Sequence, residues 1–193
     1  MNMTQENFSF DKTTAPGGSR SVATARVGTA ATERRPPSLP QRKYPSKNSV
    51  VLGQDKTALL FVSVNANNRQ SVFANADAVR CILAAWQKAD AWSVGRYMIM
   101  PDHLHFFCSP RLSPMVDFHK WMAYWKSLVA RHFPVRHELP LWQTNCWDLQ
   151  LRSQDSYDEK WHYVRNNPVR KGLVSESDEW PFQGCLNILE WRA

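Results

Sequence analysis

The fold is decided by the segment Met100-Pro101-Asp102-His103-Leu104-His105-Phe106-Phe107. It joins two strand-like stretches, residues 93–100 and 103–108, through a connection so short that we expect them to pair as a hairpin. Outward from this hairpin, hydrophobic periodicity predicts a strand at 58–64, a helix at 76–91, a helix at 115–133, a strand at 146–151 and a helix at 155–167 that Pro168 ends. The resulting order, βαββαβα, is typical of a ferredoxin-like α+β sandwich.

The two histidines of this segment are the first candidate functional residues. Side chains alternate along a strand, so His103 and His105 point to one face while Leu104 points to the other, into the core. Two neutral imidazoles held side by side can bind a divalent metal ion. The pattern by itself also fits a chance arrangement or a structural zinc site.

Composition and charge restrict the class of protein without identifying it. The 193 residues carry a net charge of +7, with eight Lys and Arg against three Asp and Glu in residues 1–48 and sixteen against fourteen in the remainder. We interpret 1–48, rich in Ser, Arg and Pro, as a disordered basic tail, and 49–193 as one globular domain. An anionic partner is favoured, but the charge does not choose between nucleic acid, membrane and acidic protein.

The apolar runs and the cysteines indicate where the protein works. No apolar run approaches the roughly 20 residues of a membrane span, and the N-terminus lacks the apolar stretch of a secretory signal. The four cysteines are scattered without a CxxC pair, which argues against a cysteine zinc ribbon or a disulfide framework. We therefore expect a cytoplasmic protein with no membrane partner.

A second candidate group lies about 60 residues downstream, on the last predicted helix. Tyr163 and Asn167 are four residues apart and would share one helix face, so a phenol oxygen and an amide oxygen can reach the same point. That arrangement is useful if the point is a metal-bound phosphate. Amphipathic packing of the helix is the alternative explanation for a single tyrosine at this position.

Together the two groups resemble a known family, the REP-associated tyrosine transposases, which are a branch of the IS200/IS605-like single-tyrosine HUH transposases. The similar segments, in the family's order, are Phe61-Val62-Ser63-Val64-Asn65 with Arg69 after it, Pro101-Asp102-His103-Leu104-His105, Tyr163-Val164-Arg165-Asn166-Asn167-Pro168-Val169-Arg170-Lys171-Gly172-Leu173-Val174, and Asp178-Glu179-Trp180-Pro181-Phe182. The resemblance covers about residues 57–183. Each motif alone is weak evidence, but their ordered combination is specific.

The resemblance implies an HUH-type domain that cuts and rejoins single-stranded DNA at palindromic hairpins. His103, His105 and Asn167 would bind Mg²⁺ or Mn²⁺, and Tyr163 would be the nucleophile that forms a 5′-phosphotyrosine. The protein would act as a monomer or a homodimer. Basic residues that would contact DNA are Lys126, Arg170 and Lys171.

The chain also departs from the family pattern. Leu149 stands where relatives often carry a histidine before the last helix, and Lys171 replaces a more common alanine. Residues 1–48 are longer than the family's usual N-terminus. These departures put the DNA specificity in doubt more than the chemistry, because none involves the His103, His105, Tyr163 and Asn167 set.

Two other functions remain open from the sequence. One is a domesticated, non-catalytic protein that binds DNA hairpins, although such a protein has no need of Tyr163. The other is an unrelated small metalloenzyme with a histidine-pair zinc site, which leaves the segment Asn167-Pro168-Val169-Arg170 unexplained. A DNA-nicking and strand-joining transposase accounts for all the motifs.

Overall fold

The computed structural model describes residues 58–111, 114–135 and 140–189. The strands are β1 (Leu59–Asn65), β2 (Trp92–Ile99), β3 (His103–Pro110), β4 (Trp147–Leu151) and β5 (Gln183–Cys185). The helices are α1 (Ala76–Lys88), α2 (Phe118–His132), α3 (Gln154–Arg165) and α4 (Asn167–Arg170), with short 3₁₀ turns η1 (Asn67–Arg69) and η2 (Ser177–Glu179). The predicted tail and its boundary at 48/49 lie outside the described residues and stay predictions.

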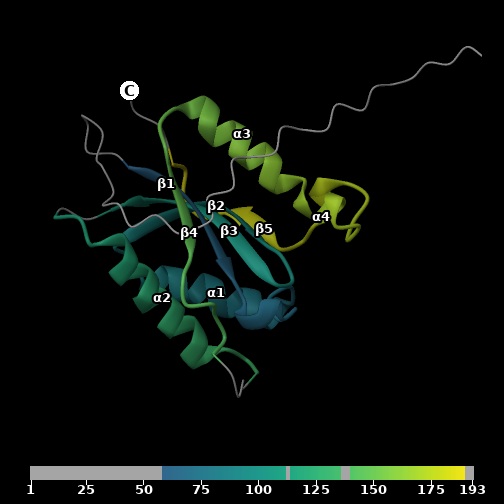
Figure 1. Cartoon of the computed structure of the whole chain (residues 1–193), viewed down its shortest axis with the longest axis horizontal. Coiled ribbons are helices and arrows are strands. Elements are labelled where there is room, and N and C mark those ends of the chain that lie inside the picture. The colour runs from purple at the N-terminus through teal and green to yellow at the C-terminus, as the bar shows by residue number, and fades with distance from the viewer. Residues whose placement is uncertain (1–57, 112–113, 136–139, 190–193) are drawn as a thin grey trace, which may run out of the picture. The chain divides into compact units, whose positions relative to one another are not determined.

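The strands form one antiparallel sheet in the order β4-β1-β3-β2-β5. Helices α1 and α2 cover one face of this sheet and α3 covers the other (Figure 1). The predicted α+β sandwich with βαββαβα order is therefore confirmed. The short edge strand β5 was not predicted, since its three residues show no alternation of apolar and polar side chains.

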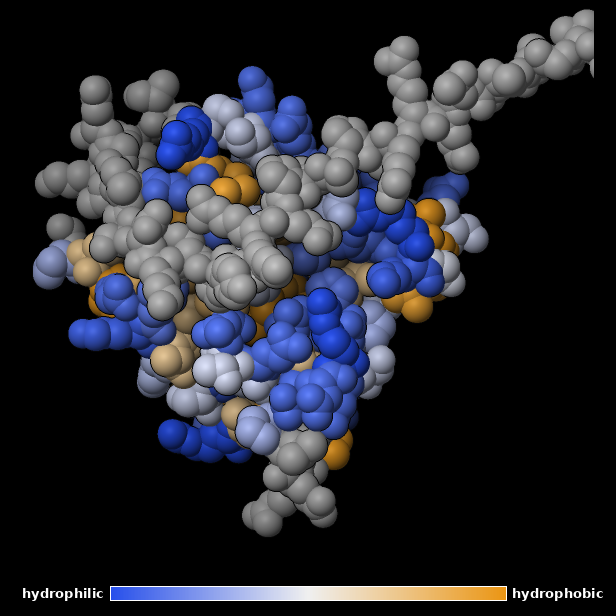
Figure 2. Space-filling view, viewed as in Figure 1, coloured by the Kyte–Doolittle hydropathy of each residue, from blue (hydrophilic) through white to orange (hydrophobic). Residues whose placement is uncertain are grey.

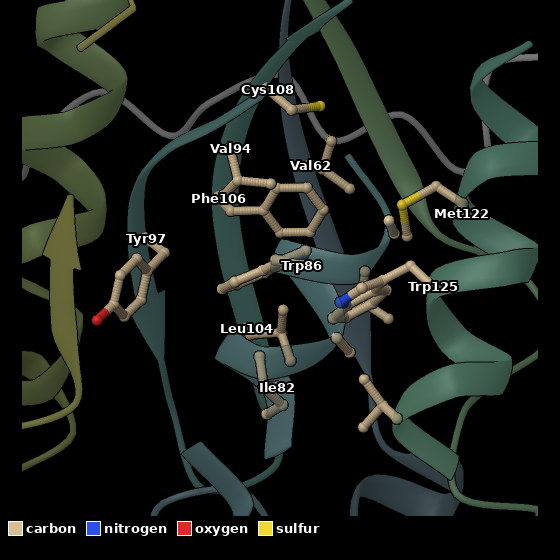
Figure 3. Close-up of a cluster of buried hydrophobic side chains, with 14 of the residues drawn as sticks. Val62, Ile82, Trp86, Val94, Tyr97, Leu104, Phe106, Cys108, Met122 and Trp125 are labelled. Carbon is tan, nitrogen blue, oxygen red and sulfur yellow. The ribbon is translucent and has the colours of Figure 1, made fainter. Parts of the chain in front are cut away.

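The core between the sheet and helices α1 and α2 is built on aromatic side chains. Trp86 of α1 and Trp125 of α2 stack with ring centroids 5.4 Å apart, and Phe106 of β3 lies 5.2 Å from Trp86 (Figure 3). Leu104, between the two histidines, is fully buried in the same cluster, as alternation along the strand predicted. The aromatic stripe of α2 is thus core.

Truncating this core should lower the free energy of unfolding strongly. Phe106 is 0% exposed, so Phe106→Ala leaves a cavity and is expected to cost about 3–5 kcal/mol, measured by urea denaturation. Tyr124→Ala on α2 is the control, because this side chain is 52% exposed and its loss should change stability by less than about 0.5 kcal/mol. Equal losses in the two variants would contradict the packing described.

The opposite face of the sheet packs against α3 and carries the histidines. Phe61 of β1 and Phe107 of β3 form a second buried cluster with Tyr157 and Val164 of α3, called the α3 cluster below. Because side chains alternate, His105 shares the face of Phe107. The sheet therefore presents the histidine pair on the side of α3.

The last predicted helix is divided in two. Residues 155–167 were expected as one helix ended by Pro168, but α3 ends at Arg165 and α4 begins at Asn167, with Pro168 in its first turn. Proline lacks the backbone N–H that would continue the hydrogen bonds of α3, while its fixed φ suits the first turn of a helix. Pro168 thus opens a short helix, which corrects the expectation.

The face in Figure 2 is mostly hydrophilic, with small separate hydrophobic patches. Among the described residues, no helix combines the length and the apolar character needed to cross a membrane.

Candidate functional site

The histidine pair lies at the start of β3. The His103 and His105 rings are 4.8 Å apart between centroids and nearly perpendicular, at 82°. The Nδ1 atom of each ring has a hydrogen-bond partner, which leaves the two Nε2 atoms as the nitrogens available to a ligand. Partner groups of this kind orient histidines that bind metals.

A carboxylate orients His103. Nδ1 of His103 donates to Oδ1 of Asp102 at 2.6 Å, and Oδ2 of Asp102 accepts from Nη1 of Arg69 at 3.2 Å. Burial raises the pKa of Asp102. The hydrogen bond and charge of His103, together with the charge of Arg69, lower this pKa by more than burial raises it, so the net shift is downward. The carboxyl group is therefore ionised at neutral pH.

A hydroxyl group and an aromatic ring hold His105. Oγ of Ser63, which is opposite His105 in the β1–β3 register, lies 2.6 Å from Nδ1 of His105. Phe61 stacks on the same imidazole, with centroids 5.5 Å apart and an interplanar angle of 19°. The position of His105 is thus set from β1 as well as from β3.

Both imidazoles are neutral at physiological pH. Burial is the largest cause that lowers the pKa of each, and it takes the pKa of His105 well below its ordinary value. The charge of Arg170 lowers the pKa of His105 further, and that of Lys171 acts in the same direction on His103. A neutral imidazole keeps the lone pair that a metal ligand needs.

The predicted nucleophile and amide lie next to each other, although on separate helices. The guanidinium of Arg170 lies over the Tyr163 ring, 3.9 Å from its centroid, and also donates to Oδ1 of Asn167. Tyr163 is partly buried against the α3 cluster and Asn167 is buried. Arg170 therefore connects the two residues across the break between α3 and α4.

The structure brings most of the predicted site residues to one side of the sheet. His103 and His105 face α3, which carries Tyr163, and the charges of Arg170 and Lys171 on the α4 segment act on the histidine pair. Lys126 belongs to α2, which covers the opposite face. The DNA contact predicted for Lys126 stays a prediction.

Lys126 holds a loop in place. Its half-buried ammonium donates to the carbonyl oxygens of Gln143 at 2.9 Å and Thr144 at 3.3 Å. Burial lowers the pKa of this amine. Gln143 in turn accepts from the side chain of Asn65, which is opposite His103 in the sheet. Lys126 thus supports the loop that borders the histidine strand.

The sequence did not assign roles to Ser63, Arg69 and Asp102. Ser63 could have been found only from the register of β1 against β3, which places it opposite His105. Asp102 was visible as the neighbour of His103, but its hydrogen bond depends on the local turn. Arg69 reaches Asp102 from a backbone with φ 55°, a conformation that the sequence does not signal.

The donor set fits a divalent metal that is held by few protein ligands. The described residues contain no group of three or more His, Cys, Asp or Glu side chains placed to hold a metal. The two Nε2 atoms and the second lone pair of Asn167 Oδ1 are the available donors. Mg²⁺ commonly binds through few side chains and completes its shell with water and substrate phosphates.

Comparison with known proteins shows what the chain is similar to. No protein-family model matches the sequence. A REP-associated tyrosine transposase of Escherichia coli K12 is 23% identical over 124 residues, which are 63% of this chain and 73% of that protein. A solved structure of a REP-associated tyrosine transposase bound to a REP hairpin matches with a TM-score of 0.60 and 19% identity, covering 72% of this chain and 81% of the other.

The fold is thus the one seen in that transposase structure. The chain is similar to the REP-associated tyrosine transposases, as its motifs predicted. Leu149 packs against the α3 cluster, on the side of the sheet that carries the candidate site.

Proposed function

We propose that this protein is a metal-dependent single-stranded DNA endonuclease and strand transferase that acts on palindromic repeat hairpins. The observation that carries the proposal is the histidine pair, with both Nδ1 atoms engaged, on the sheet face that packs against the helix of Tyr163. The relationship to REP-associated transposases, one of which was solved with a REP hairpin, supports DNA hairpins as the substrate.

His103, His105 and Asn167 would hold Mg²⁺ or Mn²⁺ through two nitrogens and one amide oxygen. When bound, the ion supplies Lewis-acid stabilisation of charge on the scissile phosphate and fixes its position. All three ligands are neutral, because burial keeps the imidazoles unprotonated by lowering their pKa values. The ligand set therefore leaves the positive charge of the ion available to the phosphate.

Tyr163 would perform the covalent step. Its phenol loses a proton and Oη attacks the phosphorus, the bond from phosphorus to the 3′ oxygen breaks, and that oxygen takes up a proton to leave as a free 3′-OH. The 5′-phosphotyrosine retains the phosphodiester energy, so a second 3′-OH can attack it and release Tyr163. Cleavage and joining therefore require no nucleotide cofactor.

Tyr157 is not suited to this role, although it precedes Tyr163 on the same helix. Tyr157 is only 4% exposed, and its ring centroid lies 4.5 Å from that of Phe107. The guanidinium of Arg96 lies over the Tyr157 ring, 5.3 Å from its centroid. Tyr157 is a core residue and serves as the matched control for Tyr163.

Arg170 and Lys171 would contribute to DNA binding beside the site. Their charges already act on the histidine pair, so a phosphate placed there would experience the same field. Single-stranded nucleic acids are commonly bound by positively charged surfaces that follow the backbone. Lys126 stays a proposed contact on the other face.

Removing the guanidinium of Arg170 should slow covalent adduct formation by about 10-fold. Arg170→Gln loses the cation over the Tyr163 ring and the hydrogen bond to Asn167. At an exposed arginine such a cation–π contact contributes roughly 0.5–1 kcal/mol, and the lost hydrogen bond adds to this. Rates are measured by quenching the reaction and resolving the protein–DNA adduct on a denaturing gel. Arg165→Gln is the control, because Arg165 pairs with Asp178 instead. A rate equal to that of the parent protein would contradict the role given to Arg170.

The proposal is tested with purified full-length protein, Mg²⁺ and a library of hairpin-forming single-stranded oligonucleotides with randomised flanks. A covalent protein–DNA adduct with a matching free 3′-OH fragment supports the transposase. Tight binding to some hairpins without an adduct on any of them would instead indicate the non-catalytic hairpin-binding protein.

A further inference from the structure

We infer that Arg69 is a positioning residue that acts through Asp102 to fix the tautomer and orientation of His103. The inference rests on the proposed function for the use made of His103, but its geometry is independent of that function. Arg69 is joined to His103 through Asp102, with which its guanidinium forms a hydrogen bond.

The Asp102 carboxylate is held at both oxygens. Oδ1 accepts from Nδ1 of His103 at 2.6 Å, and Oδ2 accepts from Nη1 of Arg69 at 3.2 Å. An ionised carboxylate can only accept hydrogen bonds, so the proton of the neutral imidazole must reside on Nδ1. The lone pair is then on Nε2, which is the atom that the proposed metal requires.

The backbone around Arg69 indicates that its side chain is needed at this place. Asn68 and Arg69 both adopt left-handed conformations, with φ 51° and φ 55°. Asparagine tolerates this region, whereas arginine rarely adopts it and glycine does so without strain. A glycine would thus satisfy the backbone, but only a long cationic side chain reaches the carboxylate.

The segment that carries Arg69 is fixed to the turn that carries Asp102. The amide of Ala66 donates to the carbonyl oxygen of Asp102 at 2.9 Å, and the amides of Val72 and Phe73 donate to that of Pro101 at 2.9 and 3.0 Å. These bonds flank Arg69 on both sides. The strained conformation is therefore held by surrounding structure, as expected where strain serves a function.

His105 lacks an equivalent control of its tautomer. Its Nδ1 faces the hydroxyl of Ser63, which can either donate or accept a hydrogen bond. The carboxylate at His103 permits only one arrangement. Loss of Arg69 or Asp102 should therefore change the tautomer of His103 and leave that of His105 unchanged, although the charge of Arg69 lowers the pKa of both imidazoles.

The experiment uses full-length protein labelled with ¹⁵N-histidine, free of metal and DNA. In the parent protein, His103 should show the tautomer with Nδ1 protonated. Asp102→Asn should give His103 a mixture of tautomers, because an amide can either donate or accept. Arg69→Gln should do so too, because a carboxylate no longer held at Oδ2 can turn away from Nδ1 of His103. Mn²⁺ affinity, followed by electron paramagnetic resonance, should fall about 10–100-fold in Asp102→Asn and about 10-fold in Arg69→Gln, as for other partners of metal-binding histidines.

Two control variants separate positioning from general effects. Arg80→Gln removes another exposed arginine–carboxylate pair, on α1, and should leave tautomer and Mn²⁺ affinity unchanged. Asn68→Gly relieves backbone strain while leaving Arg69 in place, and should also leave both unchanged. If Asp102→Asn fails to fold, Arg69→Gln decides alone, because the Arg69 side chain is 54% exposed and its replacement leaves the core in place.

The inference is wrong if Arg69→Gln leaves the His103 tautomer and Mn²⁺ affinity unchanged. If that variant loses only hairpin binding, measured in EDTA, Arg69 is a phosphate contact and the positioning role is likewise refuted. Failure of the parent protein to bind Mn²⁺ would count against the proposed function, while the tautomer measurement would still decide the role of Arg69.

Discussion

Tyr163→Phe is expected to abolish the covalent protein–DNA adduct. The variant keeps the ring that packs against the α3 cluster and under Arg170, and removes only the oxygen that would attack phosphorus. Removal of a covalent nucleophile lowers turnover on the order of 10⁴-fold or more, so no adduct should be detected. The measurement is a denaturing gel of protein incubated with Mg²⁺ and the best hairpin from the library.

The control for this prediction is Tyr157→Phe, on the same helix. Its phenol lies in the core and outside the proposed site, so adduct formation should continue at a rate close to that of the parent protein. Hairpin binding should be similar in both variants. An adduct of undiminished yield in Tyr163→Phe would refute Tyr163 as the nucleophile.

His103→Ala is expected to reduce cleavage by more than about 100-fold. Replacing a residue that only hydrogen-bonds to a metal ligand typically lowers metal affinity or activity about 10–100-fold, so removing a ligand itself should lower cleavage by more. The side chain stands at the first residue of β3 and its hydrogen bond goes to Asp102, so the core beneath the sheet is untouched. Cleavage is measured across a range of Mg²⁺ and Mn²⁺ concentrations.

Hairpin binding distinguishes the loss of a metal ligand from a general defect. Binding measured in EDTA should be largely retained in His103→Ala, because the basic groups beside the site are still present. His119→Ala, which removes an exposed histidine of α2, should leave cleavage unchanged. Normal cleavage by His103→Ala would exclude His103 from the proposed metal site.

Local periodicity accounts for what could be predicted of the fold. The two core clusters follow from alternation along β1 and β3 and from the helical spacing in α1 and α2. Alternation also placed His103 and His105 on one face with Leu104 buried on the other. These are properties of neighbouring residues, which a sequence displays directly.

Features that depend on how distant segments meet were missed. The division at Asn166 separates Tyr163 from Asn167, and only the folded chain shows that Arg170 contacts both. The pairing of β5 with β2 was absent from the prediction because a three-residue strand has no pattern of its own. A DNA contact of Lys126 is an expectation from the family resemblance, based on its place on the long helix, whereas its loop contacts depend on tertiary packing.

The sequence by itself determined that two histidines, a tyrosine and an amide exist at spacings suited to one another, since strand and helix periods are local. Only the tertiary structure decided which ring nitrogen of each histidine is available to a ligand. Asp102 and Ser63 engage Nδ1 of His103 and His105, and Arg69 reaches Asp102 from a left-handed turn. The reason is physical: hydrogen-bond partners are chosen by the register of β1 against β3 and by the loop after β1, which the whole sheet fixes.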